Sequence, residues 1–232
     1  MRHWLVLLAV LFAVGLRAAA PPAAAPPTVA VLYFDYDGSN EQLGQLRKGI
    51  AQMLTSDLSQ GPARIVERAR LQDVLDELEL ASSKKFDAAT AARVGKLLGA
   101  QYLVLGSYFE MMGALRVDAR IVETETGRII QSAGGHGKPD DFLVLEQSLA
   151  EKLLGGLGGI VVPTATRALP PPARPPVKAS AKVPTSAVAS YGRALDALDK
   201  KDKATAKREL EAVVAATPGF TLAAVDLSRL AM

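Results

Sequence analysis

Apolar side chains follow first a strand-like and then a helix-like spacing at the start of the patterned part of the chain. The run Val29 to Tyr36 is almost wholly apolar, which is typical of a buried central strand. From Glu41 to Ser59 the apolar residues recur at steps of three and four, so this stretch is predicted to be an amphipathic helix. Gly61-Pro62 ends that helix, and Arg64 to Glu67 is predicted to be a brief strand.

Two further helices are predicted before the period of the pattern changes. The spacing of leucine and valine indicates one helix that ends near Leu80 and another from about Asp87 to Leu98. Gly99 follows at the position where a left-handed helix cap is expected.

The period then becomes two, which predicts an antiparallel meander. Strands are expected over Tyr102 to Met112, Leu115 to Ile121 and Arg128 to Ala133, and a closing helix over Phe142 to Leu153. The resulting order is β, α, β, α, α, β, β, β, α. This order predicts an α+β fold, in which helices pack on a mixed sheet.

The carboxy-terminal part, residues 186–232, is predicted to form a small all-helical segment. Ala206, Leu210 and Pro218 match the second half of a tetratricopeptide repeat, whereas the first half departs from that pattern. A single repeat cannot bury its own apolar face. We therefore expect three helices that dock on another surface.

The extremities and the linkers complete the expected domain organisation. An apolar run from Trp4 to Leu16 follows Arg2 and precedes small residues, as in a cleavable signal peptide. A retained membrane anchor is the less favoured alternative, because a helical span needs about 20 apolar residues. The expected divisions are a signal peptide over 1–20, a Pro/Ala spacer over 21–27, an α+β domain over 28–160, a Pro-rich basic linker over 161–185 and the helical segment over 186–232.

Charge is distributed unevenly, although the total is nearly balanced. The whole chain has 27 basic and 24 acidic side chains, and the first 20 residues contain two arginines and no acid. The mature chain is therefore nearly neutral, and its charge gives no support for nucleic-acid binding. All charges of the linker are positive, which is compatible with a solvated spacer or with peripheral contact to an anionic membrane surface.

Candidate chemistry is sparse. His136 would be the only histidine after signal removal, and it lies in a glycine-rich stretch that reads as a loop after the last strand. Asp35 and Asp37 hint at a calcium loop but are better explained by capping and turn formation. The glycines from Gly155 to Gly159 are expected to follow a helix and lack the Lys-Ser/Thr of a phosphate loop. We therefore predict no catalytic residue, no cofactor and no metal site, and the chain is not expected to be an enzyme.

Three short signatures occur in an order that resembles one family. They are Val29 to Phe34, Ile65 to Leu71 and Val94 to Gly106, and together they resemble the curli-production (CsgG-like) family and its relatives, the FlgO-like proteins and the amino-terminal domain of TolB. The resemblance makes Glu67 and Arg68 characteristic residues. A structural ion pair or helix-start contact is the favoured role for them, and contact with a partner protein is the alternative.

The resemblance implies a periplasmic or outer-membrane-associated protein. The chain has no cysteine that could carry a lipid anchor. Our leading hypothesis is a non-enzymatic periplasmic binding or scaffold protein, with no membrane span after processing, that acts in assembly or secretion of surface structures. It would recruit envelope proteins through residues 186–232. The alternative is a ring-forming structural subunit of a curli-like outer-membrane secretion channel, and homo-oligomerisation is compatible with both.

Overall fold

The computed structural model describes residues 25–80, 86–161 and 182–231. The expected signal peptide, the first part of the Pro/Ala spacer and most of the expected linker lie outside these residues.

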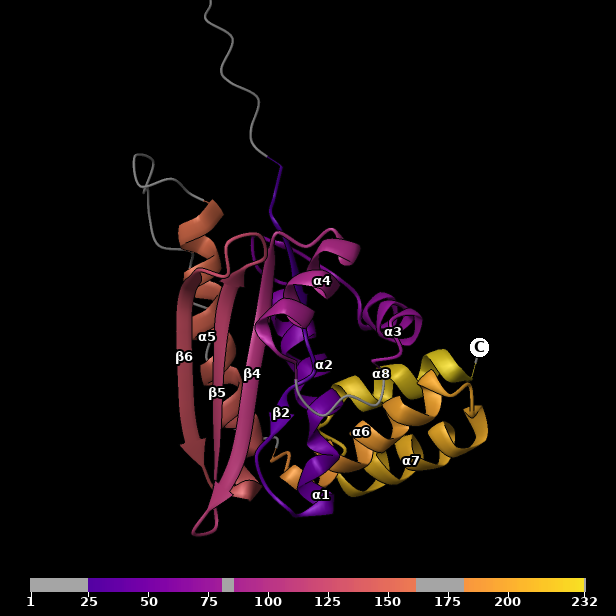
Figure 1. Ribbon diagram of the computed structural model, residues 1–232. Helices are drawn as coiled ribbons and strands as arrows, with labels where there is room; N and C mark the ends of the chain where they lie inside the picture. Colours follow the sequence, from indigo (N-terminus) through magenta and orange to yellow (C-terminus); the bar gives the residue numbers. More distant parts are fainter. Residues whose placement is uncertain (1–24, 81–85, 162–181, 232) are drawn as a thin grey trace, which may run out of the picture.

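The sheet is mixed, as predicted for an α+β fold (Figure 1). Its strands run in the order β3-β1-β4-β5-β6, and β2 pairs with β4 beside β1. The first strands, β1, β2 and β3, pair in parallel with their neighbours, whereas β4, β5 and β6 form the predicted antiparallel meander. The strands are β1 Thr28–Val31, β2 Asp35–Tyr36, β3 Arg64–Ile65, β4 Tyr102–Met111, β5 Ala114–Glu123 and β6 Ile129–Gly137.

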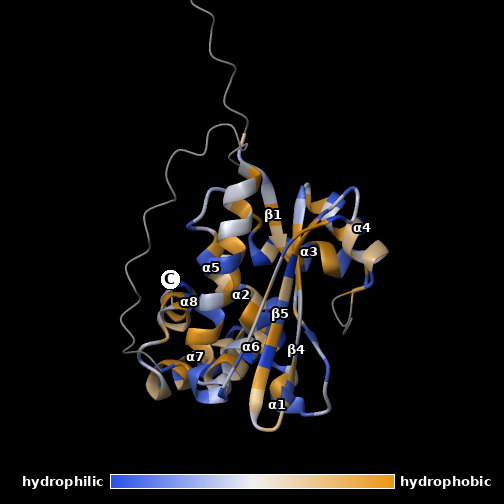
Figure 2. Cartoon of the chain, turned by 90° about the vertical axis from the view of Figure 1, so that its left-hand side faces the viewer, coloured by the Kyte–Doolittle hydropathy of each residue, from blue (hydrophilic) through white to orange (hydrophobic). Residues whose placement is uncertain are grey.

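The helices form layers around this sheet. They are α1 Glu41–Gly44, α2 Leu46–Leu58, α3 Arg68–Glu77, α4 Ala88–Leu98, the 3-10 helix η1 Pro139–Asp141, α5 Phe142–Val161, α6 Thr185–Asp199, α7 Lys203–Ala216 and α8 Thr221–Leu230. In Figure 1, α2 and α5 lie behind the sheet and α4 lies in front of its β4 side. Among the helices that the structure describes, none covers the front of β5 and β6 (Figure 1). The strand β5 accordingly alternates buried and exposed residues, and Figure 2 shows hydrophobic and hydrophilic residues following one another along it. Its buried residue Ile121 faces α5, since a Cβ at Gly156 would come 3.2 Å from it.

The predicted helix from Glu41 to Ser59 is broken at Gln45 into α1 and α2. The break lies where α6 crosses, because a Cβ added at Gly192 would come 2.0 Å from the Gln45 carbonyl oxygen. A Cβ at Gly49 of α2 would likewise come 2.7 Å from Val188 of α6. Glycine on both helices therefore allows their backbones to approach closely. The apolar run Val29 to Tyr36 also forms two short strands, β1 and β2, and not one.

The prediction that His136 lies in a loop is wrong. Residues Gly134 to Gly137 continue β6, and His136 is paired with Arg116 of β5. The glycines have a packing role: a Cβ at Gly134 would come 2.2 Å from the Asp118 carboxylate, and one at Gly135 would come 2.6 Å from Leu145. Glycine therefore allows the side chains of Asp118 and Leu145 to lie close against the backbone of β6 without shifting.

The expected place of the glycines from Gly155 to Gly159, after a helix, is also wrong, because they lie inside α5. The closing helix is longer than its clearest apolar periodicity suggested. The cap prediction at the other helix is confirmed: Gly99 ends α4 with a φ of 64°, in the left-handed region that favours glycine.

The three carboxy-terminal helices dock on the same chain. Buried residues of α6, such as Val188 and Tyr191, belong to one continuous apolar core with Val29 of β1 and Leu54 of α2. Figure 1 shows α6, α7 and α8 beside α1 and α2. The surface on which these helices were expected to dock is therefore, for α6, the face formed by α1 and α2.

Candidate functional site

An open basin of about 570 Å³ lies on the uncovered face of the sheet. Outward side chains of β4, β5 and β6 form its floor, and Phe86, just before α4, lines one side. Tyr33, Asp35 and Asp37 line another side, because the chain leaves β1 there and pairs again with β4 through β2. The basin is defined by these side chains together with Ser107, Arg116, Asp118, Arg120, Ser132 and His136.

The charged side chains on the basin floor differ in whether they form an ion pair. Arg116 donates two hydrogen bonds to Asp118, at 2.7 and 2.8 Å, from side chains that are both well exposed. These hydrogen bonds, with the attraction between the charges, raise the pKa of Arg116. Arg120, two residues along β5, is exposed and has no ion-pair partner among the residues that the structure describes. The basin can therefore bind polar or anionic groups through Arg120 without breaking the Arg116–Asp118 pair.

The basin brings together residues that the sequence placed in unrelated motifs. Asp35 lies 3.9 Å from Arg47 of α2, and the Asp37 backbone donates to the Tyr108 carbonyl, so both belong to the end of the sheet. His136 reaches the same basin from β6. Within the described part of the chain, no group of three or more histidine and acidic side chains is placed to hold a metal ion.

A second polar group joins the α+β part to the carboxy-terminal helices. Lys48 of α2 contacts Asp199 of α6 at 2.7 Å and Asp196 at 2.5 Å, and Arg68 of α3 also contacts Asp199. The side chain of Asp199 is only 8% exposed, so its charge is balanced by two cations in a mostly dry position. We call Lys48, Arg68, Asp196 and Asp199 the ionic network.

Tyr33 packs against the ionic network. Lys48 lies 5.1 Å from the centre of the Tyr33 ring, and the Tyr33 hydroxyl donates to Gln72 at 2.8 Å. Burial raises the pKa of Tyr33 well above its ordinary value, although the positive charge of Arg68 opposes this. Burial is the largest single influence on the pKa of Arg68 and would lower it, but attraction and hydrogen bonding to Asp199 and Tyr33 together outweigh burial and leave the pKa raised. The positive charge of Arg68 is thus maintained in the folded chain.

Glu67 and Arg68, which the sequence singled out together, have different positions. Glu67 is exposed at the amino-terminal cap of α3 and its side chain makes no capping hydrogen bond. Arg68 points into the ionic network. Sequence reasoning did not identify Lys48 or Asp199; the only available signal was that Asp196 and Asp199 lie three residues apart, on one side of a helix.

The repeat-like positions lie on and after α7. Ala206 and Leu210 are fully buried, whereas Pro218 is exposed in the connection to α8. The tetratricopeptide-like character of this segment stays a prediction.

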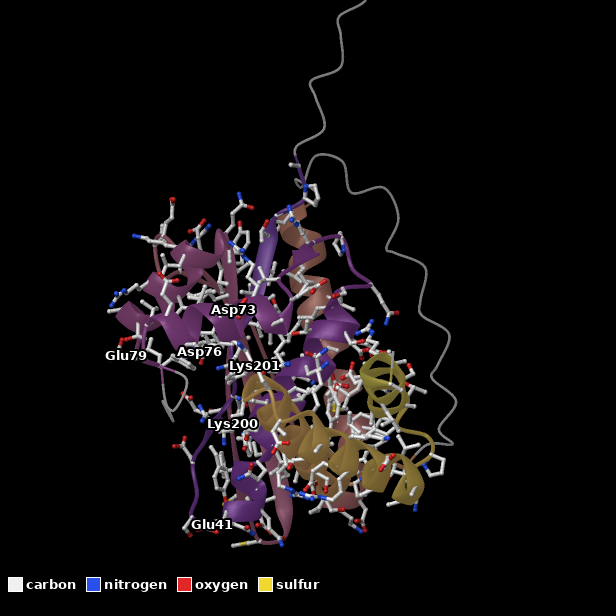
Figure 3. All side chains as sticks on the ribbon, turned by 90° about the vertical axis from the view of Figure 1, so that its right-hand side faces the viewer. Glu41, Asp73, Asp76, Glu79, Lys200 and Lys201 are labelled. Atoms are coloured by element: carbon white, nitrogen blue, oxygen red, sulfur yellow. The ribbon has the colours of Figure 1, made fainter. Side chains whose placement is uncertain are left out.

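Exposed charges of opposite sign lie on one side of the molecule, beside the ionic network. Asp73 and Asp76 of α3 are on the same side as Lys200 and Lys201 in the turn between α6 and α7, and Glu79 lies farther from the lysines on that side (Figure 3). We call these residues the mixed-charge surface. Its acidic half comes from the α+β part and its basic half from the carboxy-terminal helices, so it exists only while α6 is docked.

Comparison with known proteins places the amino-terminal part of the chain in a family context. Residues 13–111, which are fewer than half of the chain, match the family described as "Curli production assembly/transport component CsgG". The CsgG-like resemblance seen in the sequence is therefore confirmed. No curated protein matches the chain.

Several solved structures are similar. The LpoB C-terminal domain from Salmonella enterica is 20% identical, with a TM-score of 0.41, covering 51% of this chain and 87% of that one. Lipoprotein GNA1162 from Neisseria meningitidis is 11% identical, with a TM-score of 0.43 and coverages of 58% and 99%. The PelC dodecamer from Paraburkholderia phytofirmans is 16% identical, with a TM-score of 0.38 and coverages of 60% and 93%. Among the described helices of the present chain, none is long and apolar enough to cross a membrane.

Proposed function

We propose that this chain, which is CsgG-like over residues 13–111, is a non-enzymatic binding or scaffold protein of the cell envelope that acts in the assembly or export of surface structures. The observation that carries the proposal is the docking of the carboxy-terminal helices on the α+β part. This docking creates the mixed-charge surface, which neither part could form alone. We propose this surface as the place where an envelope protein is bound.

The contacts around Asp199 support this role. The ionic network adjoins the mixed-charge surface in the chain: Arg68 belongs to α3, which supplies Asp73 and Asp76, and Asp199 directly precedes Lys200. Holding α6 against α3 therefore fixes Lys200 and Lys201 relative to Asp73 and Asp76. A preorganised surface loses less conformational entropy on binding than one whose halves move independently.

The composition of the mixed-charge surface indicates how a partner would be recognised. An acidic half lies beside a basic half, so a partner needs charges of both signs in matching positions. Such contacts contribute more to specificity and association rate than to affinity, and they weaken as salt screens them. We therefore expect a salt-sensitive protein–protein interaction.

Site-specific photo-crosslinking in cells tests the proposal. A photoreactive amino acid replaces Lys201 in the full-length chain, and the matched control replaces Lys207, an exposed lysine of α7 outside the mixed-charge surface. We expect a discrete adduct with an envelope protein from position 201 and none, or much less, from position 207. Equal adducts at both positions, or none at position 201, would contradict the assignment of this surface.

Processing and location are tested separately. Trp4 is the only tryptophan of the chain and lies in the expected signal peptide. Protein purified from the periplasmic fraction should therefore show tyrosine emission alone. Tryptophan emission from that material would contradict signal cleavage without affecting the proposed binding surface.

A further inference from the structure

The strand β6 is an open edge of the sheet. It is the last strand in the sheet order, and Figure 1 shows no described segment beyond it. The opposite edge, β3, has two residues, whereas β6 has nine. An edge of that length presents a row of backbone groups that can pair with another strand.

The usual protection of an edge strand is almost absent from β6. Its sequence, Ile-Ile-Gln-Ser-Ala-Gly-Gly-His-Gly, contains no proline, lysine, arginine or acid. Natural proteins commonly use such residues to prevent edge-to-edge pairing. One protecting contact comes from helix α5: the Lys152 ammonium group donates a hydrogen bond to the Gly134 carbonyl at 3.0 Å.

The helix behind this edge carries exposed glycines that the described fold does not explain. A Cβ added at Gly155, Gly158 or Gly159 would meet no described atom within 4 Å. A glycine within a helix destabilises it by about 0.5–1 kcal/mol relative to alanine. By contrast, Gly156 has an internal reason, since its Cβ would come 2.7 Å from Gln131 of β6.

Two of the unexplained glycines lie on the side of α5 next to the open edge. Gly155 and Gly159 follow Ser148 and Lys152 at steps of three and four, so the four residues form one stripe along the helix. Lys152 reaches β6, which places the stripe beside the edge strand. Gly155 and Gly159 have no side chains, so at their end of the stripe a second helix can approach closely.

We propose that a second copy of this chain binds at this side, so that β6 pairs antiparallel with β6 of the copy about a two-fold axis at Ala133. A two-fold axis normal to the sheet makes one continuous sheet and leaves both basins on the same face. The same axis brings α5 beside α5 of the copy. Lys152 of α5 lies beside Gly134 and Gly156 lies beside Gln131, so the middle of the stripe is level with Ala133. An axis at Ala133 therefore makes the stripe of one copy face the same stripe of the other.

The residues of β6 fit such self-pairing. About Ala133, Ser132 of one copy lies opposite Gly134 of the other, and Gln131 lies opposite Gly135. Ser132 and Gln131 thus each meet a glycine, Ile130 lies opposite His136, and no formal charge of one strand opposes a charge of the other. Pairing requires that the Lys152 ammonium group leave the Gly134 carbonyl, so the loss of this hydrogen bond is part of the free-energy cost of dimerisation.

Sedimentation velocity of the full chain over a wide concentration range tests the proposal. The disruptive variant is Gly155→Leu with Gly159→Leu, and Gly158→Leu on another side of α5 is the matched control, because all three positions have open space. We expect the double variant to raise the dimer dissociation constant at least about tenfold and, at concentrations where both parent and variant are monomeric, to leave the melting temperature unchanged or higher. Gly158→Leu should leave the dissociation constant unchanged.

Disulfide trapping tests the register independently. Cα atoms opposite each other in an antiparallel pair are about 4.5–5.5 Å apart, within the range that a disulfide spans. The chain has no cysteine, so Ala133→Cys should give a covalent dimer under mild oxidation, whereas Arg208→Cys on α7 should not.

Three outcomes would overturn the proposal. One is a monomer at every concentration reached. Another is an oligomer that neither the glycine variants nor the Ala133→Cys trap affects. The third is a monomer whose melting temperature falls in the Gly155 and Gly159 double variant, because another part of the same chain would then cover the stripe.

Discussion

Removing the Asp199 carboxylate should loosen the carboxy-terminal helices from the α+β part. The Asp199→Ala change leaves Arg68 and Lys48, whose side chains are only 13% and 14% exposed, without the acid that they share. Neither cation can be fully hydrated in place. The docked arrangement of α6 therefore becomes less stable than in the unchanged chain.

The loss in the free energy of unfolding depends on how well Lys48 and Arg68 are still paired or hydrated after the change. Breaking a buried ion pair by removing one partner destabilises a protein by about 3–5 kcal/mol. Lys48 keeps Asp196 at 2.5 Å, and both cations retain some contact with solvent, so the loss is smaller. We expect a decrease of about 2–3 kcal/mol in the free energy of unfolding, which for a chain of this size lowers the melting temperature by about 5–10 °C.

Thermal and urea unfolding, followed by circular dichroism, measure this effect. Glu211→Ala is the matched control, because its pair with Lys207 is exposed, spans 3.8 Å and should contribute less than about 0.5 kcal/mol. The double change Arg68→Met with Asp199→Leu should recover most of the lost stability, since it removes both charges of the pair together and leaves apolar side chains in their place. If Asp199→Ala destabilised no more than Glu211→Ala, the ionic network could not be what holds α6 in place.

Three other predictions follow from contacts described above. Gly192→Ala should destabilise the chain by at least about 2 kcal/mol in urea unfolding, because its Cβ would come 2.0 Å from a backbone carbonyl; an unchanged midpoint would contradict the close crossing of α2 and α6. Burial raises the pKa of Tyr33, Tyr108 and Tyr191, so the folded chain keeps protons that the unfolded chain loses, and stability should fall as pH rises above about 10. Phenolate absorbance equivalent to all five tyrosines of the chain, appearing without unfolding, would contradict this. Asp202 caps the amino terminus of α7, and a hydrogen bond from the amide of Thr205 lowers its pKa. The stabilisation from ionised Asp202 is therefore present at neutral pH and lost as pH falls below about 4. The difference in melting temperature between Asp202→Ala and the parent chain should narrow in acid, and a difference that stays constant would refute the contribution of the charge.

Local patterns predicted the elements that local forces determine. The meander could be predicted because Leu115, Val117, Ala119 and Ile121 alternate with polar residues, and all four are buried against the helix layer. The end of α4 could be predicted because Gly99 supplies a left-handed conformation that other residues adopt with strain.

Features that depend on distant residues could not be predicted from these patterns. The glycines in β6 were predicted to form a loop, because glycine interrupts the alternation of apolar and polar side chains. The packing of Asp118 and Leu145 against these glycines depends on residues that are distant or on another element, and no local pattern indicates it. The partner of Arg68 is 131 residues away, and no local spacing indicates it. The basin was missed for the same reason: Asp35 and His136 were each considered alone, and only the sheet order brings them together.

The ionic network also has a consequence for the order in which the chain can complete its fold. Lys48 and Asp199 are 151 residues apart, and the face that α2 presents to α6 is built long before α6 is synthesised or exported. Contacts of such sequence separation close slowly, because a long loop must be ordered first. An amino-terminal part that emerges first will therefore present an apolar α2 face until the carboxy terminus arrives, and during that interval it depends on holding factors or on fast export to avoid aggregation.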